Sequence, residues 1–194
     1  MRGVITMSER ITGHTELIGL MAYPIRHSSS PAMQNEAFAK LGYDYAYLAF
    51  EVGADEIEDA VNAIRTLKMR GSNVSMPNKT LVGQYLDELS PAAEMCGAVN
   101  TIVNDHGHLT GHITDGIGFM AALKDNNINA IGKKMTIVGA GGAATAIEIQ
   151  AALDGVGEIV IFNRKDEFWG RAVSTVEKIN TRTSSHAVLY DLAD

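Results

Sequence analysis

The sequence predicts an α/β protein with two domains, each built around a largely parallel sheet. Apolar runs of strand length alternate with amphipathic runs of helix length along the chain, which is typical of α/β folds. A glycine-rich turn joins a strand-like run to a helix-like run within residues 135–153. The natural division between the two halves of this pattern falls near residues 115–132.

The first half of the chain carries five predicted strands and four predicted helices. Ser30 and Pro31 suit the N-cap and the first helical position of one helix, and Ile57, Val61 and Ile64 have the spacing of one helical face. The predicted strands are residues 15–21, 45–52, 71–76, 98–103 and 108–113, of which the last two form a hairpin around the turn 104–107. The predicted helices are residues 30–41, 55–67, 79–86 and 91–97.

The second half repeats a strand and helix alternation. The predicted helices are residues 115–124, 143–153 and 168–179, and the predicted strands are residues 135–138, 158–162 and 187–190. We therefore expect a first domain over residues 1–118, a connecting helix and linker over 119–132, and a second domain over 133–194. A full doubly wound domain has about six strands, so the second domain is predicted to be incomplete and the sequence to be part of a longer protein.

Composition excludes several classes of protein. With 46% hydrophobic and 20% charged residues the chain is an ordinary globular sequence. A net charge of -7 argues against nucleic acid or an anionic membrane as a partner. Cys96 is the single cysteine, which excludes an intrachain disulfide and a cysteine-based metal site. No run reaches the roughly 18 apolar residues of a membrane span, and residues 1–12 lack a signal-peptide core. We expect a cytoplasmic protein.

The glycine-rich turn predicts a dinucleotide site. An apolar strand-like run ends at Gly139, Gly141 and Gly142, and a helix-prone run follows. Glycines let backbone N–H groups approach a pyrophosphate, whose charge the helix N-terminus favours. Ala144 stands where the third glycine of the fingerprint falls. The alternative is a tight turn that binds nothing. The pattern favours NAD or NADP as cofactor.

The end of the following strand would face the adenosine ribose. Asn163, Arg164, Lys165 and Asp166 stand there. An acidic side chain at this place accepts hydrogen bonds from the ribose hydroxyls of NAD, whereas a basic one neutralises the 2′-phosphate of NADP. Because both types are present, we expect use of both cofactors; the alternative is a solvated turn.

A serine-rich loop follows the first strand. Ser28, Ser29 and Ser30 precede a helix N-terminus, where hydroxyl donors and the helix dipole suit a carboxylate. Helix capping is the competing explanation, but it needs one serine, which we assign to Ser30.

Two charged residues follow strands in positions that suit catalysis. Lys79 comes after the strand at residues 71–76, and Asp115 opens a helix after the strand at 108–113. Strand ends line the ligand crevice of α/β sheets, and a lysine beside a carboxylate can move a proton to or from a hydroxyl. A surface lysine and a helix cap are the alternatives. The six histidines lack metal-ligand spacing, and we expect no metal.

These stretches together resemble the shikimate dehydrogenase family, and most closely its quinate/shikimate dehydrogenase branch. Five motifs occur in the family's order. They are P-I-x-H-S-x-S-P at residues 24–31, N-V-T/S-x-P-x-K at 73–79, G-A-x-N-T at 97–101, T-D-G-x-G at 114–118 and G-A-G-G-A at 139–143. The resemblance covers residues 18–194.

The resemblance implies roles for matching residues. Lys79 and Asp115 would be the catalytic pair. The residues implied to bind substrate are Ser28, Ser30, Ser75 and Asn100. The residues implied to bind the cofactor are Gly139, Ala140, Gly141, Gly142, Ala143, Asn163, Arg164 and Asp166.

Three departures from the family's usual residues point to the branch with broader substrate and cofactor choice. Ser75 replaces a threonine, Gln34 replaces a histidine, and residues 163–166 replace Asn-Arg-Thr. Family members also run on for about a hundred residues, which should hold further nucleotide-domain strands and a closing helix.

The resemblance thus implies an NAD(P)-dependent oxidoreductase that interconverts shikimate with 3-dehydroshikimate and quinate with 3-dehydroquinate, with a homodimer possible. Two alternatives stay open. One is a dehydrogenase of another substrate class, such as a folate-linked enzyme, against which the serine loop argues. The other is a truncated, non-catalytic module that binds nucleotide or ligand.

Overall fold

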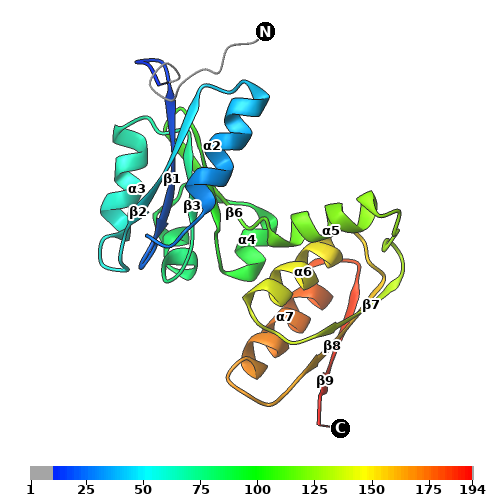
Figure 1. Cartoon of the computed structure of the whole chain (residues 1–194). Coiled ribbons are helices and arrows are strands. Elements are labelled where there is room, and N and C mark those ends of the chain that lie inside the picture. Colours follow the sequence, from blue (N-terminus) through cyan, green and yellow to red (C-terminus); the bar gives the residue numbers. More distant parts are fainter. Residues whose placement is uncertain (1–10, 194) are drawn as a thin grey trace. The chain divides into compact units, whose positions relative to one another are not determined.

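The computed structural model describes residues 11–193 and confirms the predicted α/β class. The chain forms two compact units (Figure 1). The first comprises Met1–Leu89 and Ala98–His112, and the second comprises Ser90–Gly97 and Ile113–Asp194. The expectation about a signal peptide at residues 1–12 falls almost entirely outside the described residues. None of the helices within residues 11–193 is long and apolar enough to cross a bilayer.

The first unit contains a mixed six-stranded sheet in the order β2-β1-β3-β5-β6-β4. Strand β1 pairs in parallel with β2 and β3, whereas β5 runs antiparallel to both β3 and β6. Its strands are β1 Glu16–Ala22, β2 Tyr45–Glu51, β3 Gly71–Val74, β4 Glu88–Leu89, β5 Thr101–Asp105 and β6 His108–His112. Parallel pairing places the carboxyl ends of β1, β2 and β3 at one edge of the sheet.

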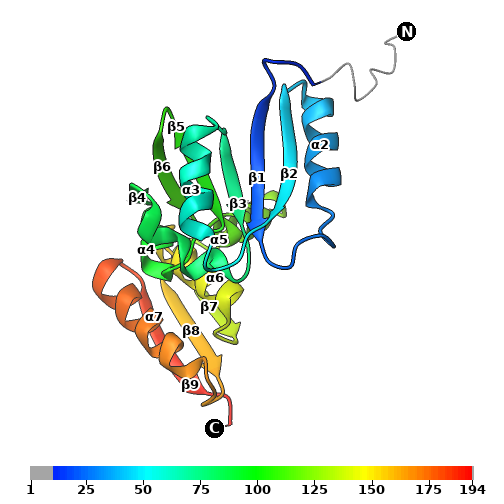
Figure 2. The ribbon, with the colours of Figure 1, turned by 90° about the vertical axis from the view of Figure 1, so that its left-hand side faces the viewer.

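Two helices cover opposite sides of this sheet (Figures 1 and 2). Helix α2 (Ser30–Leu41) packs Phe38 against a core that includes Leu20 and Tyr47. Helix α3 (Ile57–Thr66) buries Ile57, Val61 and Ile64, which is the predicted apolar face. On that side Asn104 of β5 donates from Nδ2 to the carbonyl of Met69 at 2.7 Å.

Residues 79–86 differ from the predicted helix. They form two short 3-10 segments, η1 (Asn78–Thr80) and η2 (Val82–Tyr85), after Pro77. Thr80, Val82 and Gly83 are weak helix formers, which favours short 3-10 turns over a continuous α-helix here. The two-residue strand β4 was not predicted, because a pair of residues carries no periodicity.

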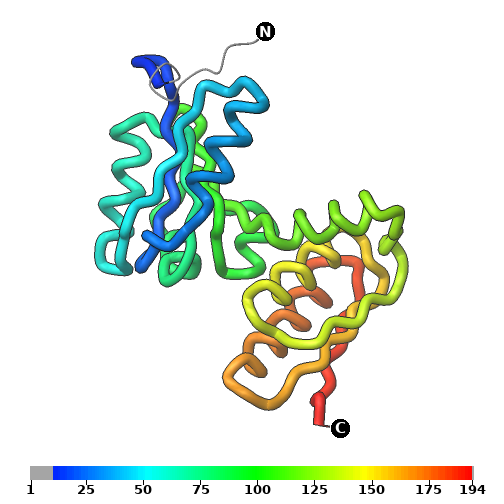
Figure 3. Tube along the Cα trace, viewed as in Figure 1, coloured from blue at the N-terminus to red at the C-terminus, as the bar shows by residue number. Residues whose placement is uncertain are grey.

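The second unit contains a three-stranded parallel sheet in the order β7-β8-β9. Its elements are α4 Pro91–Cys96, α5 Asp115–Asp125, β7 Lys134–Val138, α6 Gly142–Leu153, β8 Glu158–Asn163, α7 Trp169–Arg182 and β9 His186–Asp191. Figure 3 traces the chain from β7 through α6, β8 and α7 to β9, two successive βαβ crossovers. Three strands are half of a doubly wound sheet.

The two units differ from the predicted domains 1–118, 119–132 and 133–194 at two places. Helix α4 groups with the second unit, where Lys178 of α7 donates from Nζ to the Met95 carbonyl at 2.8 Å and Arg182 pairs with Glu94 at 2.9 Å. Helix α5 also belongs to the second unit rather than to a separate linker, because it packs on α6.

Gly116 makes the packing of α5 on α6 possible. A Cβ at this position would lie 2.3 Å from the Ala146 carbonyl oxygen, whereas a Cβ on Gly118 of the same helix would meet no described atom within 4 Å. The second glycine of the motif at 114–118 is therefore sterically unconstrained, and the first is required.

We expect Gly116→Ala to destabilise the second unit by about 1–3 kcal/mol, because the methyl group forces two helix backbones apart. Gly118→Ala is the matched control and should be neutral or stabilising by up to about 1 kcal/mol through helix propensity. Urea unfolding followed by the fluorescence of Trp169 measures both. Equal stability of the two variants would contradict the close packing.

Candidate functional site

Two loops meet at the carboxyl edge of the first unit's parallel strands. The Tyr23 amide donates to the Met76 carbonyl at 3.1 Å, and the Ser75 amide donates to the Met21 carbonyl at 3.0 Å. The serine loop after β1 and the segment 75–79 after β3 therefore lie side by side. Residues 75–79 carry two predicted site residues, Ser75 and Lys79, both partly buried.

The serine loop corrects one assignment. Ser30 is the first residue of α2 rather than its N-cap, and the Ser30 amide donates to Ser28 Oγ at 3.2 Å. Ser28 thus satisfies an N–H group at the helix start. Because a hydroxyl accepts with its lone pairs and donates with its hydrogen, Ser28 can perform this task and still donate to a bound carboxylate.

Asn100 and Lys79 are tied to the same edge by backbone hydrogen bonds. The Val74 amide donates to the Asn100 carbonyl at 2.8 Å, and the Val99 amide donates to the Lys79 carbonyl at 2.8 Å. The first unit thus brings the predicted substrate residues to one edge of its sheet, from three separate parts of the chain.

A partly buried polar network supports this edge and was not assigned from the sequence. The Tyr47 hydroxyl donates to Asn73 Oδ1 at 2.8 Å, Asn73 Nδ2 donates to Thr101 Oγ1 at 3.1 Å, and the Thr101 hydroxyl donates to Asn100 Oδ1 at 3.0 Å. Burial raises the pKa of Tyr47 to about 12, so its hydroxyl stays a donor. In the sequence, the feature that could have revealed this network is the presence of polar residues within the predicted strands.

Asp115 lies in the second unit, where it is the first residue of α5 and is exposed. The next residue, Gly116, is in close contact with α6, and this contact fixes the backbone of Asp115 within the second unit. Lys79 belongs to the first unit and Asp115 to the second, so their pairing remains a prediction.

The glycine-rich turn has the geometry of a phosphate cradle. Gly139 has φ 105°, which favours glycine, and a Cβ on Gly141 or Gly142 would meet no described atom within 4 Å. Helix α6 begins at Gly142, with Gly141 as N-cap. Its first N–H groups have no partner within the helix, and Gly141 has no side chain to cap them. An anion fits in the space that side chains would fill.

The side chain of Asn163 joins the glycine-rich turn to the turn after β8. Asn163 Oδ1 accepts from the Ala140 amide at 3.1 Å, while Nδ2 donates to the Arg164 carbonyl at 2.7 Å and to Asp166 Oδ1 at 3.1 Å. Asn163 is buried. The Ala140 N–H is therefore used inside the protein, and Asn163 positions both turns, a role that the sequence did not reveal.

These two turns fit a dinucleotide. The open glycine positions suit a pyrophosphate at the start of α6, and the turn 163–166 presents Arg164 on the surface.

Among residues 11–193, no group of three His, Cys, Asp or Glu side chains is placed to hold a metal ion. Burial raises the pKa of the Cys96 thiol to about 12, so it stays protonated and is a poor nucleophile.

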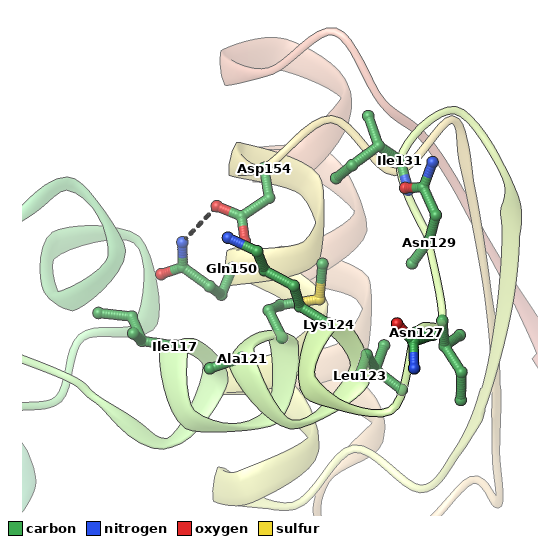
Figure 4. Close-up of a pocket in the computed structure, with 12 residues that line it drawn as sticks. Ile117, Ala121, Leu123, Lys124, Asn127, Asn129, Ile131, Gln150 and Asp154 are labelled. Carbon is green, nitrogen blue, oxygen red and sulfur yellow. Dashed lines mark hydrogen bonds between the residues drawn. The ribbon is translucent and has the colours of Figure 1, made fainter.

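A separate groove of about 940 Å³ lies between α5, the loop after it and α6 (Figure 4). Ile117, Ile128 and Ile131 line it, and Gln150 bonds Asp154 at 2.8 Å on its α6 wall. The predicted site residues are not among its lining residues. The candidate site consists of the loops at the strand ends rather than of this groove.

Comparison with known proteins gives a consistent result. Residues 20–102 match the model of the shikimate dehydrogenase substrate binding domain. The chain is 69% identical over 188 residues to the shikimate dehydrogenase (NADP(+)) of Listeria innocua serovar 6a, covering 97% of this chain and 65% of that protein. It therefore spans about two thirds of the length of the curated relatives that it matches.

Two solved structures are similar. Shikimate 5-dehydrogenase from Listeria monocytogenes in complex with shikimate and NAD is 69% identical, with a TM-score of 0.92 over 96% of this chain and 64% of that chain. Shikimate 5-dehydrogenase from Thermus thermophilus in complex with NADP(H) and shikimate is 30% identical, with a TM-score of 0.74 over 91% of this chain and 68% of that chain.

Glu148 of α6 is a buried carboxyl group. It is 0% exposed, and neither carboxyl oxygen has a hydrogen-bond partner among residues 11–193. Burial raises its pKa from an ordinary value of 4.5 to about 8. The folded protein therefore holds a proton here that the unfolded chain releases above pH 4.5.

The proton on Glu148 predicts that the stability of the folded protein falls as the pH rises. The free energy of unfolding is unaffected by Glu148 below pH about 4.5, where the carboxyl group is protonated in both states, and it falls as the pH rises towards about 8. The total loss is on the order of 2–4 kcal/mol. Urea unfolding at pH 5, 6, 7 and 8 should show this fall. Glu148→Gln should flatten it, and Glu177→Gln, at an exposed glutamate of α7, should not. An unchanged slope in Glu148→Gln would refute the assignment.

Proposed function

The chain belongs to the shikimate dehydrogenase family, and we propose that, at the full length of its relatives, the protein is an NAD(P)-dependent dehydrogenase that interconverts shikimate and 3-dehydroshikimate. The observation that supports this most is the gathering of the serine loop, the segment 75–79 and Asn100 at one sheet edge. A relative 69% identical carries the name shikimate dehydrogenase (NADP(+)), which agrees with the proposal.

The hydroxyls of Ser28, Ser30 and Ser75 bind the carboxylate of the substrate in this proposal. Ser28 lies in the serine loop, Ser30 is the first residue of α2, and Ser75 lies on the adjacent loop. The start of α2 adds the favourable end of a 12-residue helix. Three neutral donors suit a ring acid because they hold its carboxylate without neutralising the nearby lysine. Asn100 bonds a ring hydroxyl and is oriented by Thr101 at 3.0 Å.

Lys79 and Asp115 act on the reacting oxygen. A bound nicotinamide supplies or accepts the hydride at the ring carbon. In oxidation the pair takes the hydroxyl proton, and in reduction it returns that proton while the ammonium polarises the carbonyl.

Gly139 to Ala143 and the turn 163–166 hold the cofactor in this proposal. The open space at Gly141 and Gly142 admits the pyrophosphate, and Arg164 lies where a basic side chain faces a 2′-phosphate. We propose NAD and NADP as cofactors, a homodimer as a possible assembly and the cytoplasm as the location. A metal is not required for a hydride transfer that a nicotinamide supports.

The alternative function, a module that binds nucleotide or ligand without turnover, can be separated from catalysis by experiment. A chain with three nucleotide-domain strands could bind nucleotide or ligand without turnover. Steady-state assays of the 194-residue chain and of a form extended to the relatives' length separate the two functions. Turnover by the extended form alone assigns catalysis to the complete protein.

We expect Lys79→Ala, in the extended form, to lower kcat about 10²–10⁴-fold, because the proton transfer loses its donor. KM for shikimate should change far less, since the serine hydroxyls still bind the carboxylate. Lys40→Ala removes an exposed lysine of α2 that pairs with Glu36 and should leave both constants unchanged. A kcat within about threefold of wild type would contradict the role of Lys79.

Quinate as a second substrate rests on Ser75, where related shikimate-specific enzymes carry threonine. We expect wild type to use both acids and Ser75→Thr to lower kcat/KM for quinate more than for shikimate, because the added methyl group narrows the carboxylate site. Parallel kinetics with both acids measure the ratio. No quinate turnover by wild type, or an equal effect on both acids, would contradict this assignment.

A further inference from the structure

Two of the three charged side chains in the turn 164–166 are held by the protein itself. Asp166 Oδ1 accepts from Asn163 Nδ2 at 3.1 Å and from the Phe168 amide at 2.9 Å. These bonds bridge the turn through one of the two carboxylate oxygens, Oδ1. Asp166 therefore acts first as a positioning residue of the turn.

Lys165 is held by a residue outside the turn. Its Nζ lies 3.0 Å from Asp191 Oδ2 and 5.5 Å from the centroid of the Trp169 ring. Asp191 is the last residue of β9 and pairs in register with Asn163 of β8. The Asp191 side chain is 12% exposed and the Lys165 side chain 65%. The carboxylate is thus fixed at the strand end, and the lysine bends to meet it.

Asp191 keeps its charge in the pH range of an assay. The Ala193 amide donates to Asp191 Oδ1 at 3.1 Å, and this bond together with Lys165 lowers the pKa of the carboxyl group. The ion pair therefore persists at neutral pH. It neutralises one of the two cations, Arg164 and Lys165, that the turn carries.

We propose that Asp191 is a specificity-determining residue for the cofactor, because its ion pair with Lys165 withholds that ammonium from a ribose 2′-phosphate. Arg164 alone then faces the phosphate, so NAD remains competitive with NADP. This inference rests on the proposed cofactor site. It assigns the balance between the two cofactors to a residue of β9, outside the motif at 139–143 and outside the turn itself.

Titration of the 194-residue chain with NADP⁺ and with NAD⁺ tests the inference. Trp169 is the single tryptophan and lies beside Lys165, so its fluorescence reports binding at the turn. Asp191→Asn keeps an oxygen for the Ala193 amide but removes the charge. We expect it to tighten NADP⁺ binding about threefold or more, a gain typical of one ion-pair partner, and to leave NAD⁺ binding within about twofold.

Two further variants make the test specific. Asp125→Asn removes a negative charge from the exposed end of α5 in the same unit and should change neither affinity. In a Lys165→Gln background Asp191→Asn should have no effect, since the ammonium that it would release is absent.

Each outcome decides between the possibilities. The role of Asp191 would be overturned if Asp191→Asn left the ratio of NADP⁺ to NAD⁺ affinity unchanged. It would also be overturned if Asp125→Asn tightened NADP⁺ binding equally, or if Asp191→Asn gave the same gain in the Lys165→Gln background. Each of these results would leave the proposed cofactor site intact. If the 194-residue chain binds neither dinucleotide, the same titrations are made on the form extended to the relatives' length. If that form also binds neither, the proposed cofactor site fails, and this inference fails with it.

Discussion

Parallel pairing of β1 with both β2 and β3 determines where the loops of the first unit can lie. Strands that run in the same direction end at the same edge, so the serine loop after β1 and the segment 75–79 after β3 emerge as neighbours. A backbone hydrogen bond from the Tyr23 amide to the Met76 carbonyl then joins these loops, and one from the Ser75 amide to the Met21 carbonyl joins the second loop to β1. Side chains that are far apart in the sequence therefore come to one edge of the sheet.

The same constraint shapes the second unit, where β7, β8 and β9 are all parallel. The glycine-rich turn, the turn after β8 and Asp191 all lie at the carboxyl ends of these strands. Asn163 adds the link between the first two turns through its side-chain amide, and Asp191 adds an ionic link between the second and the end of β9. A cofactor site built in this way depends on the buried side-chain amide of Asn163 as much as on the exposed charged residues that would contact the ligand.

Periodicity and turn chemistry predicted most of the elements, and physical reasons explain the rest. Helix α3 was predictable because Ile57, Val61 and Ile64 recur on one face and are all buried. The 3-10 segments at 78–85 were not, because one-turn segments are decided by local geometry rather than by an apolar face. Only the hydrogen bond from the Ser30 amide to Ser28 Oγ shows that Ser28 rather than Ser30 satisfies the start of α2.

Long-range partners limited the prediction of the site. The sequence placed Asn163 beside a ribose, but its bond to the Ala140 amide spans 23 positions and leaves no pattern. The ion pair between Lys165 and Asp191 has the same origin. Glu148 was visible as a single charged residue in an apolar helix-prone run, although only burial shows that its carboxyl group holds a proton.

A crystal structure of the protein at the full length of its relatives, with shikimate and cofactor bound, measures the decisive geometry. We expect Lys79 Nζ and an Asp115 carboxylate oxygen within about 3 Å of the same ring oxygen, a normal hydrogen-bond distance, with the serine hydroxyls on the substrate carboxylate. Lys79 or Asp115 turned away from the bound ring would contradict the dehydrogenase assignment.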